Sequence, residues 1–272
     1  MGGSLRSRVG LGCLSVVLAT SCGPGARDTE PLAYADSAGL YAARLMEDLG
    51  GQKAWDEARY VSFRWLVERN GETVANREHA WDRYEGRYRL SYEQGGAAHL
   101  MIFDIDEPRV DPVVGKVPAG GVWIDGQPLP AAARDSALSR GFRVFINDTY
   151  WALMPFKWGD PGVHLTYEGR RTLSDGREYA TIHLTFDPGL GVTEDQYWAF
   201  LEPASGHMAA WQFHLGGSEA PGDLIWWEDW SSVGAIRFAM TRRGDDGALG
   251  VFFRDVVANP TVPAGRFDPP LP

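Results

Sequence analysis

Short segments in which apolar and polar side chains alternate recur along most of this chain, and turn residues separate them. In the first such segment, Val61, Phe63, Trp65 and Val67 occupy every second position, which is the period of a strand with one buried face. Asn70-Gly71 follows and favours a two-residue hairpin turn. Strands joined by such turns pair antiparallel, so the pattern predicts a mainly β protein.

Similar segments continue to the C-terminal end of the 272-residue chain. The 11 Trp, 10 Tyr and 12 Phe residues favour pleated strands and a large apolar core. No internal repeat or change of composition marks a second domain, so residues 36–272 are predicted to form one domain. The further predicted strands cover residues 76–83, 86–93, 99–105, 121–124, 163–168, 178–186, 196–201, 207–215, 224–230, 235–242 and 250–257.

Helical spacing occurs near the start of this domain and in its middle. Asp36 or Ser37 is predicted to cap a helix that runs to Leu49 and ends at two glycines, and a short helical turn follows at Ala54-Trp55. In the middle, residues 131–138 and 144–154 are predicted to form two separate helices, the second of them stopped by a proline.

The first residues read as a targeting segment. Arg6 and Arg8 precede an apolar run from Val9 to Ala19, which is too short to span a bilayer. The formal net charge of −10 becomes more negative when these two arginines are removed with the segment. An electrostatic surface for nucleic acid is therefore not expected.

The apolar run ends in Leu18-Ala19-Thr20-Ser21-Cys22, which resembles the lipobox of bacterial lipoproteins, where the cysteine is acylated and becomes the new N-terminus. The resemblance implies a signal peptide over residues 1–21, lipidation of Cys22 with acyl chains such as palmitate, and a flexible tether over residues 22–35. Gly23, and not aspartate, follows the cysteine, and by analogy with enterobacterial sorting this favours the outer membrane. The alternative is an ordinary secretory signal with a chance cysteine.

Catalytic patterns are weak in this sequence. It contains no nucleophile elbow, zinc-protease motif, phosphate loop or dinucleotide fingerprint. His164 and His183 lie on neighbouring predicted strands, but a metal site needs three or four convergent ligands, so solvated histidines are expected. Glu228-Asp229 resembles the acids of a glycan-binding cleft, yet adjacent strand residues point to opposite faces. We therefore expect no enzyme activity, no cofactor and no metal.

The order of several short motifs resembles the LolA/LolB-like superfamily of lipoprotein-sorting and lipid-carrier proteins, and in particular a lipoprotein branch of it. The resemblance covers residues 36–270, and its specificity lies in the order of the motifs. They are Gly50-Gly51, Ala54-Trp55, residues 59–63, 80–83, 87–90, 146–151, 154–156, 160–163, 227–230, 252–256 and 267–270.

The resemblance implies a single incomplete antiparallel β-barrel, a LolA-like half barrel with an N-terminal helix and a central helical lid, around an apolar cavity for acyl chains. In LolA an arginine inside the barrel helps hold the lid. Arg83, Arg87 and Arg89 are the candidates here, but the proline usual in that region is missing, so the role is not transferred. The chain also differs from LolA in its apparent tether, and no segment clearly matches the protruding apolar loop of LolB.

A sheet that does not close leaves a concave apolar face that can hold one ligand. We predict that the chain is a monomeric, lipid-anchored carrier or chaperone at the periplasmic face of the outer membrane, which binds an acyl chain, a lipid or a lipoprotein. The alternatives are a sensor or protein-interaction module without cargo and, less favoured, a glycan or lipid hydrolase. For each predicted lining residue, ordinary core packing is the competing interpretation. These residues are Phe63, Trp65, Trp81, Leu90, Met101, Phe103, Tyr150, Trp151, Met154 and Phe156.

Overall fold

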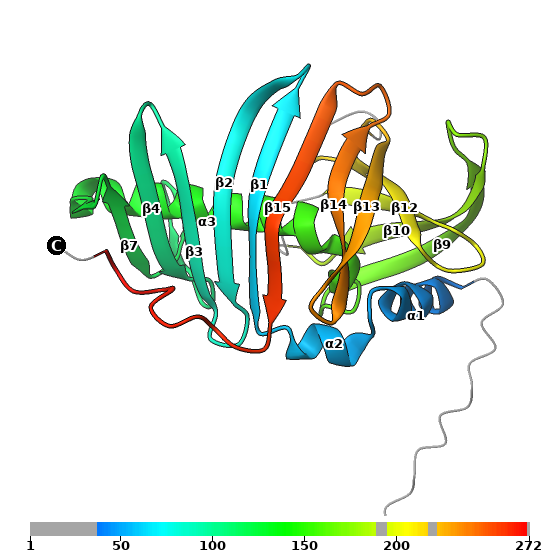
Figure 1. Ribbon diagram of the computed structural model, residues 1–272, viewed down its shortest axis with the longest axis horizontal. Helices are drawn as coiled ribbons and strands as arrows, with labels where there is room; N and C mark the ends of the chain where they lie inside the picture. Colours follow the sequence, from blue (N-terminus) through cyan, green and yellow to red (C-terminus); the bar gives the residue numbers. More distant parts are fainter. Residues whose placement is uncertain (1–36, 189–194, 217–221, 271–272) are drawn as a thin grey trace, which may run out of the picture. The chain divides into compact units, whose positions relative to one another are not determined.

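The strands of this protein form one large curved sheet in the computed structural model, which describes residues 37–188, 195–216 and 222–270 (Figure 1). The predicted signal peptide and tether, including Cys22, lie outside these ranges. Thirteen strands in the described part pair antiparallel in the order β8-β7-β4-β3-β2-β1-β15-β14-β13-β12-β11-β10-β9, and β5 and β6 form a separate hairpin. The strands are β1 (Tyr60–Arg69), β2 (Glu72–Asp82), β3 (Arg87–Gln94), β4 (Ala97–Asp104), β5 (Arg109–Asp111), β6 (Gly115–Val117), β7 (Gly120–Ile124), β8 (Gln127–Pro128), β9 (Val163–Thr172), β10 (Glu178–Phe186), β11 (Gln196–Leu201), β12 (Met208–His214), β13 (Ile225–Val233), β14 (Ile236–Gly244) and β15 (Leu249–Asn259).

The last strand returns to the middle of the sheet. Strand β15 pairs with β1 along almost its whole length, from Tyr60 opposite Asn259 to Arg69 opposite Leu249. Strands β2, β3, β4, β7 and β8 lie on one side of this central pair and β9 to β14 on the other, and the edge strands β8 and β9 do not pair with each other in the described part. The predicted mainly β fold, an incomplete antiparallel barrel, is confirmed.

The predicted strands all appear, with ends that differ by a few residues. At Asn70-Gly71 both φ angles are positive, 51° and 82°, as a type I′ hairpin requires. Strands β5, β6 and β8 were not predicted, because they are only two or three residues long and therefore too short to show a period.

The middle of the chain corrects one prediction. Residues 131–138 and 144–154 were expected to be two helices, but α3 runs without a break over Ala131–Leu153. Gly141 sits inside this helix because of packing: a Cβ there would lie 2.6 Å from Sδ of Met101 on β4 and 3.4 Å from the Phe103 ring. The glycine therefore lets the helix approach the sheet closely, at some cost in helix propensity.

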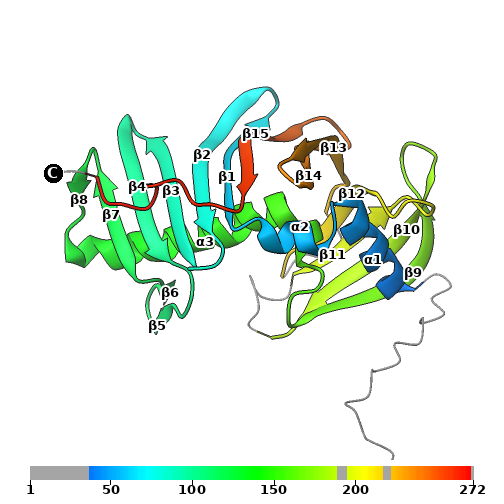
Figure 2. The ribbon, with the colours of Figure 1, turned by 60° about the horizontal axis from the view of Figure 1, so that its bottom comes forward.

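Two short helices lie along one rim of the sheet (Figure 2). Helix α1 (Ala38–Asp48) begins as predicted at Ser37, whose side chain accepts a hydrogen bond from the backbone N–H of Leu40, and α2 (Gln52–Glu57) follows. Gly50 between them has a φ of 109°, and a Cβ there would collide with a backbone oxygen of the β13–β14 turn. No helix in the described ranges is both long and apolar enough to cross a bilayer.

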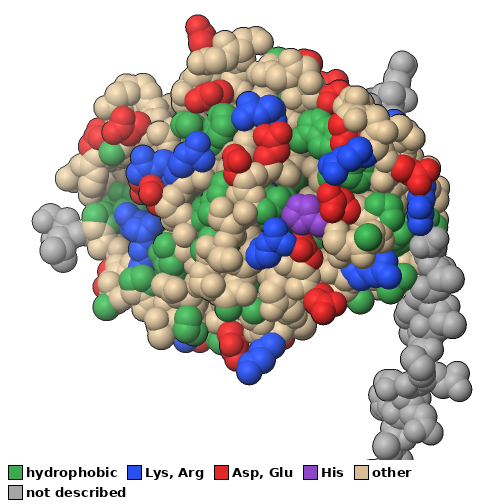
Figure 3. Space-filling model, turned by 45° about the vertical axis from the view of Figure 1, so that its right-hand side comes forward, with side chains coloured by type: hydrophobic (Ala, Val, Ile, Leu, Met, Phe, Trp, Pro, Cys, Tyr) green, Lys and Arg blue, Asp and Glu red, His purple; other side chains and the backbone are tan. Residues whose placement is uncertain are grey.

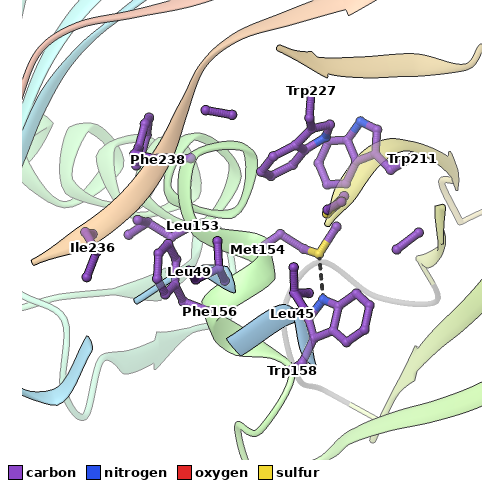
Figure 4. Close-up of a cluster of buried hydrophobic side chains, with 14 of the residues drawn as sticks. Leu45, Leu49, Leu153, Met154, Phe156, Trp158, Trp211, Trp227, Ile236 and Phe238 are labelled. Atoms are coloured by element: carbon purple, nitrogen blue, oxygen red, sulfur yellow. Dashed lines mark hydrogen bonds between the residues drawn. The ribbon is translucent and has the colours of Figure 1, made fainter. Parts of the chain in front are cut away.

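Helix α3 crosses the concave face of the sheet and contributes to the core of both halves (Figure 1). Its 23 residues extend over roughly 34 Å. The first half of the helix, with Phe142, packs on strands β3, β4 and β7. Its C-terminal end and the following 3-10 turn η1 (Met154–Lys157) are enclosed by α1 and by strands β12 to β14 (Figure 4), and the indole N–H of Trp158 donates to Sδ of Met154 at 3.0 Å.

Replacing Gly141 tests the close approach of α3 to the sheet. We expect Gly141→Val to lower the free energy of unfolding by about 2 kcal/mol, because the new side chain overpacks against Met101 and Phe103. The matched control is Arg140→Val at the exposed neighbouring position, where we expect a loss of about 0.5 kcal/mol. Chemical denaturation of both variants measures this, and equal losses would contradict the packing role.

Candidate ligand-binding face

The predicted lining residues of β1 to β4 lie on the concave face, in rows that run across the strands, whereas the other four, Tyr150, Trp151, Met154 and Phe156, belong to α3 and η1. Phe63 on β1, Leu90 on β3 and Met101 on β4 share one row, because His79 on β2 is opposite both Phe63 and Leu90. A neighbouring row contains Trp81, which is opposite Tyr88 on β3, and Phe103. The alternation read from the sequence thus identified the correct face of these strands.

Most of these side chains are buried by other parts of the protein. Within the packed interior, seven of the ten expose at most 5% of their surface, and these are Phe63, Trp65, Leu90, Met101, Phe103, Met154 and Phe156. Trp81, Tyr150 and Trp151 are half-buried. The buried residues touch their own neighbours, for example Phe63 and the ring of Phe253 at 5.6 Å. Contact between these seven and a ligand therefore stays a prediction that requires α3 to move.

A buried polar network holds the middle of α3 on the sheet. Arg77 of β2 donates to both carboxylate oxygens of Asp148 on α3, at 2.6 and 3.1 Å. Nε2 of His79 lies 3.2 Å from the same carboxylate, and its Nδ1 lies 2.7 Å from the Tyr88 hydroxyl. Asp148 and His79 are almost completely buried. Asp148 belongs to the predicted helix 144–154, and its side chain lies at the helix–sheet contact.

A second contact holds the C-terminal end of α3. Arg242 of β14 is fully buried and donates to the carbonyl oxygens of Trp151 and Ala152, both at 3.2 Å. Its guanidinium carbon lies 3.5 Å from the centroid of the Trp227 ring. The last carbonyls of a helix lack partners within the helix, and a cation suits the negative end of its dipole. Burial lowers the pKa of Arg242 well below its ordinary value.

Arg83 and Arg87, two of the arginines considered from the sequence, make other contacts. Arg83 stacks on Trp55 of α2 with 3.5 Å from its guanidinium carbon to the ring centroid, and Arg87 binds Asp82 at the end of the hairpin. Arg77 and Arg242 anchor α3, but neither was predicted from the sequence. They reach the helix through the strand register and the β1–β15 pairing, which only the folded structure reveals.

The concave face also carries a group of partly exposed aromatic rings, which we call the aromatic patch. Tyr150 lies 4.7 Å from Tyr197 and Trp151 lies 5.0 Å from Trp211, measured between ring centroids. Every ring of the patch except the buried Trp211 is half-buried. The patch joins the C-terminal half of α3 to strands β10, β11 and β12, and it consists of Tyr150, Trp151, Phe186, Tyr197, Trp211 and Phe213.

The pKa shifts of ionisable groups in and beside the aromatic patch indicate an apolar environment. Burial raises the pKa of the Tyr150 and Tyr197 hydroxyls above the ordinary value, so both rings stay neutral. Burial also raises the pKa of Asp195, which directly precedes β11. The buried indole Nε1 of Trp211 has no hydrogen-bond partner in the described part of the protein, a state that it shares with the indoles of Trp65, Trp81 and Trp227. The patch therefore combines apolar area with one buried donor that lacks an acceptor.

The polar residues considered for catalysis lie apart from one another. His164 pairs with Asp187 at 2.7 Å, and Nδ1 of His183 lies 3.0 Å from Glu168. Glu228 accepts from Arg243, and the neighbouring Asp229 accepts from Thr241. In the ranges that the structure describes, no three His, Cys, Asp or Glu side chains are grouped as a metal site requires.

The buried network makes a pH-dependent contribution to stability. Burial lowers the pKa of His79, and this effect outweighs the attraction of Asp148. The folded protein therefore binds fewer protons at this site than the unfolded chain, in which the pKa of a histidine is about 6.5. We therefore expect the free energy of unfolding to fall as the pH drops below about 6.5. Urea denaturation between pH 7.5 and 5 measures this, and His79→Gln should flatten the slope.

The control for this experiment is His99→Gln, a half-buried histidine that stacks on Tyr92. It should leave the slope unchanged. If the curves of the His79→Gln variant and of the wild-type protein run parallel over this range, the role assigned to His79 is wrong.

Comparisons with known proteins yield structural neighbours of low sequence identity. No family model matches the chain, and no curated protein matches it. A DUF1329 family protein from Desulfovibrio piger has a TM-score of 0.44 at 8% identity, covering 86% of this chain and 98% of its own. A LolA superfamily protein from Nitrosomonas europaea has a TM-score of 0.41 at 10% identity, covering 78% and 94%.

MucB, which has also been solved in complex with MucA, has a TM-score of 0.26 at 15% identity, and the match spans 84% of this chain and 60% of MucB. The function proposed below rests on contacts within this chain. The arrangement of the protein itself is an open antiparallel sheet around a central helix.

Proposed function

We propose that this protein binds one apolar chain, such as the acyl chain of a lipid or lipoprotein, against the aromatic patch. The observation that carries the proposal is the half-buried state of five neighbouring rings on the concave face. Rings that served only the core would be expected to be buried like Phe63 and Phe103. Contiguous exposed apolar area on a soluble domain is typical of a binding site.

The binding energy would come from removal of hydrocarbon from water. Each buried methylene contributes roughly 0.8 kcal/mol, so an acyl chain needs aromatic area more than specific polar contacts. The unpartnered indole N–H of Trp211 supports a ligand with an acceptor oxygen at one end, because a buried donor without an acceptor is costly. A carboxyl or ester oxygen of an acyl ligand has this chemistry.

We place the protein at the periplasmic face of the outer membrane, held by lipid on Cys22, where it would act as a non-enzymatic carrier or chaperone. The motif ending at Cys22 and the apolar run before it support this location. Charged side chains of both signs are interspersed with hydrophobic ones on the face shown in Figure 3, so that face offers no broad single-charge surface to an anionic membrane.

Acid substitutions in the aromatic patch test the ligand site. We expect Phe186→Asp and Phe213→Asp each to weaken binding of the fluorescent fatty acid cis-parinaric acid at least about tenfold, or about 1.4 kcal/mol, because each places a charge against the hydrocarbon. Fluorescence titration of the purified domain measures this. The control Val110→Asp adds the same charge at a side chain that is 77% exposed on β5, and it should bind like the wild-type protein.

A fatty acid can also show whether the ligand binds at the aromatic patch or at the buried residues beneath α3. A dibrominated fatty acid quenches the fluorescence of tryptophans that it touches. Trp151→Phe should remove much of this quenching, whereas Trp65→Phe should leave it nearly unchanged. Quenching that depends on Trp65 would instead place the ligand beneath α3, where the sequence-based prediction put it. Absence of saturable fatty-acid binding in the wild-type protein would contradict the proposal that it is a carrier.

The anchor has its own test. Expression of the full chain in a Gram-negative host with labelled palmitate should label the protein, and Cys22→Ala should abolish the label and release the protein from membranes. Cys13→Ala is the matched control and should behave like the wild-type chain. A protein that is secreted and processed without label would show that the apolar run is an ordinary secretory signal.

A further inference from the structure

Strands β2 and β3 separate along their length, although they are neighbours in the sheet (Figure 1). They pair from Asp82 opposite Arg87 as far as Arg77 opposite Tyr92. Beyond this point β2 continues to Glu72 and pairs only with β1, while β3 continues to Gln94 and pairs only with β4. Residues 72–76 of β2 therefore form a free strand edge inside the sheet.

A local irregularity explains the separation. In the β1–β2 ladder, Val67 is opposite Ala75 but Glu68 is opposite Thr73, so Val74 is an extra residue on β2. Such a bulge bends its strand and increases the local twist. The β3–β4 hairpin has no such shift up to its Gly95-Gly96 turn. The β1–β2 and β3–β4 hairpins thus diverge beyond the Arg77–Tyr92 pair, toward their turns.

The separation leaves a groove of about 670 Å³, which we call the β2/β3 groove. Its size lies within the range of ligand pockets, but its lining is largely polar and includes backbone from both hairpins. Val74 on its rim is 55% exposed. The lining residues are Arg64, Thr73, Val74, Ala75, Asn76, Glu78, Ser91, Tyr92, Glu93, Ala98 and His99.

The free edge determines what kind of partner fits. Along a strand, alternate residues direct their backbone N–H and C=O groups to the same neighbour, so part of the backbone between Glu72 and Asn76 has no partner strand on the β3 side. An extended peptide supplies the complementary donors and acceptors. A lipid tail or a sugar does not supply them in this repeating pattern.

The charge of the groove gives the partner a further property. Arg64 is engaged by Glu78 at 2.7 Å and by Asp255 at 3.6 Å. The lining also contains Glu93, so its three charged residues, Arg64, Glu78 and Glu93, carry a net charge of −1. This negative charge favours a peptide with a basic side chain.

We propose that the β2/β3 groove is a docking site for an extended, basic peptide segment of a partner protein, which adds as a strand to residues 72–76 of β2. This site is separate from the aromatic patch, on the other half of the sheet. It would let a lipid-binding domain recognise a protein partner and its apolar ligand independently.

The test uses a synthetic eight-residue peptide of alternating threonine and valine with two lysines, and the same peptide with alternate backbone nitrogens methylated. We expect the first peptide to bind and to slow amide hydrogen exchange at some residues within 72–76. The methylated peptide should bind at least about tenfold more weakly, because it cannot form the ladder of hydrogen bonds. Absence of binding, or equal binding of both peptides, would overturn the proposal.

Two variants separate charge and site. Glu93→Lys should weaken peptide binding severalfold, and the effect should diminish in high salt. Glu47→Lys, which makes the same change on an exposed residue of α1, should not weaken it. Phe213→Asp should bind the peptide normally even where fatty-acid binding is lost, so the two proposals fail separately. Self-association that Glu93→Lys abolishes would instead assign the groove to a second copy of the chain.

Discussion

The structure depends on how a single helix is held inside an unclosed sheet. A sheet whose edges do not meet has a concave apolar face that must be covered, and α3 covers it across both halves. Apolar contact alone does not fix a helix at one rotation or depth, whereas the bidentate contact between Arg77 and Asp148 does. Arg242 fixes the far end by donating to the final carbonyls of the helix. Gly141 sets the distance between helix and sheet.

These contacts give the two halves of the concave face different properties. Under the first half of α3, Leu90, Met101 and Phe103 are almost completely buried, and Arg77 and His79 contact the buried Asp148. Beside the second half, Trp151 and its neighbours in the aromatic patch remain partly open. One half thus serves mainly as the anchor of the helix, and the other carries the aromatic patch, the site that we propose for an apolar ligand.

The strands were predictable because each carries its own period and ends in its own turn, as at Asn70-Gly71. The inward face of β1 to β4, and with it Phe63 and Met101, followed from alternation alone. Only part of the aromatic patch could be predicted from the sequence. Tyr150 and Trp151 were identified on the predicted helix, but Phe186, Tyr197 and Phe213 are ordinary aromatic positions on three strands until the sheet order is known. The continuity of α3 across Gly141 was not predicted, because the packing of this glycine against Met101 and Phe103 exists only in the folded structure.

The position of β15 has a consequence for how the chain reaches this fold. Strand β1 is among the first strands to be made, yet the neighbour on one of its sides is the last strand, nearly two hundred residues later in the sequence. Until that strand arrives, the centre of the sheet is an open edge flanked by Phe63 and Trp65. Pairings so distant in sequence slow folding and leave intermediates prone to aggregation. Truncation within the thirteen residues that follow Asn259 would remove little mass, but cutting back into β15 would leave the middle of the molecule unpaired.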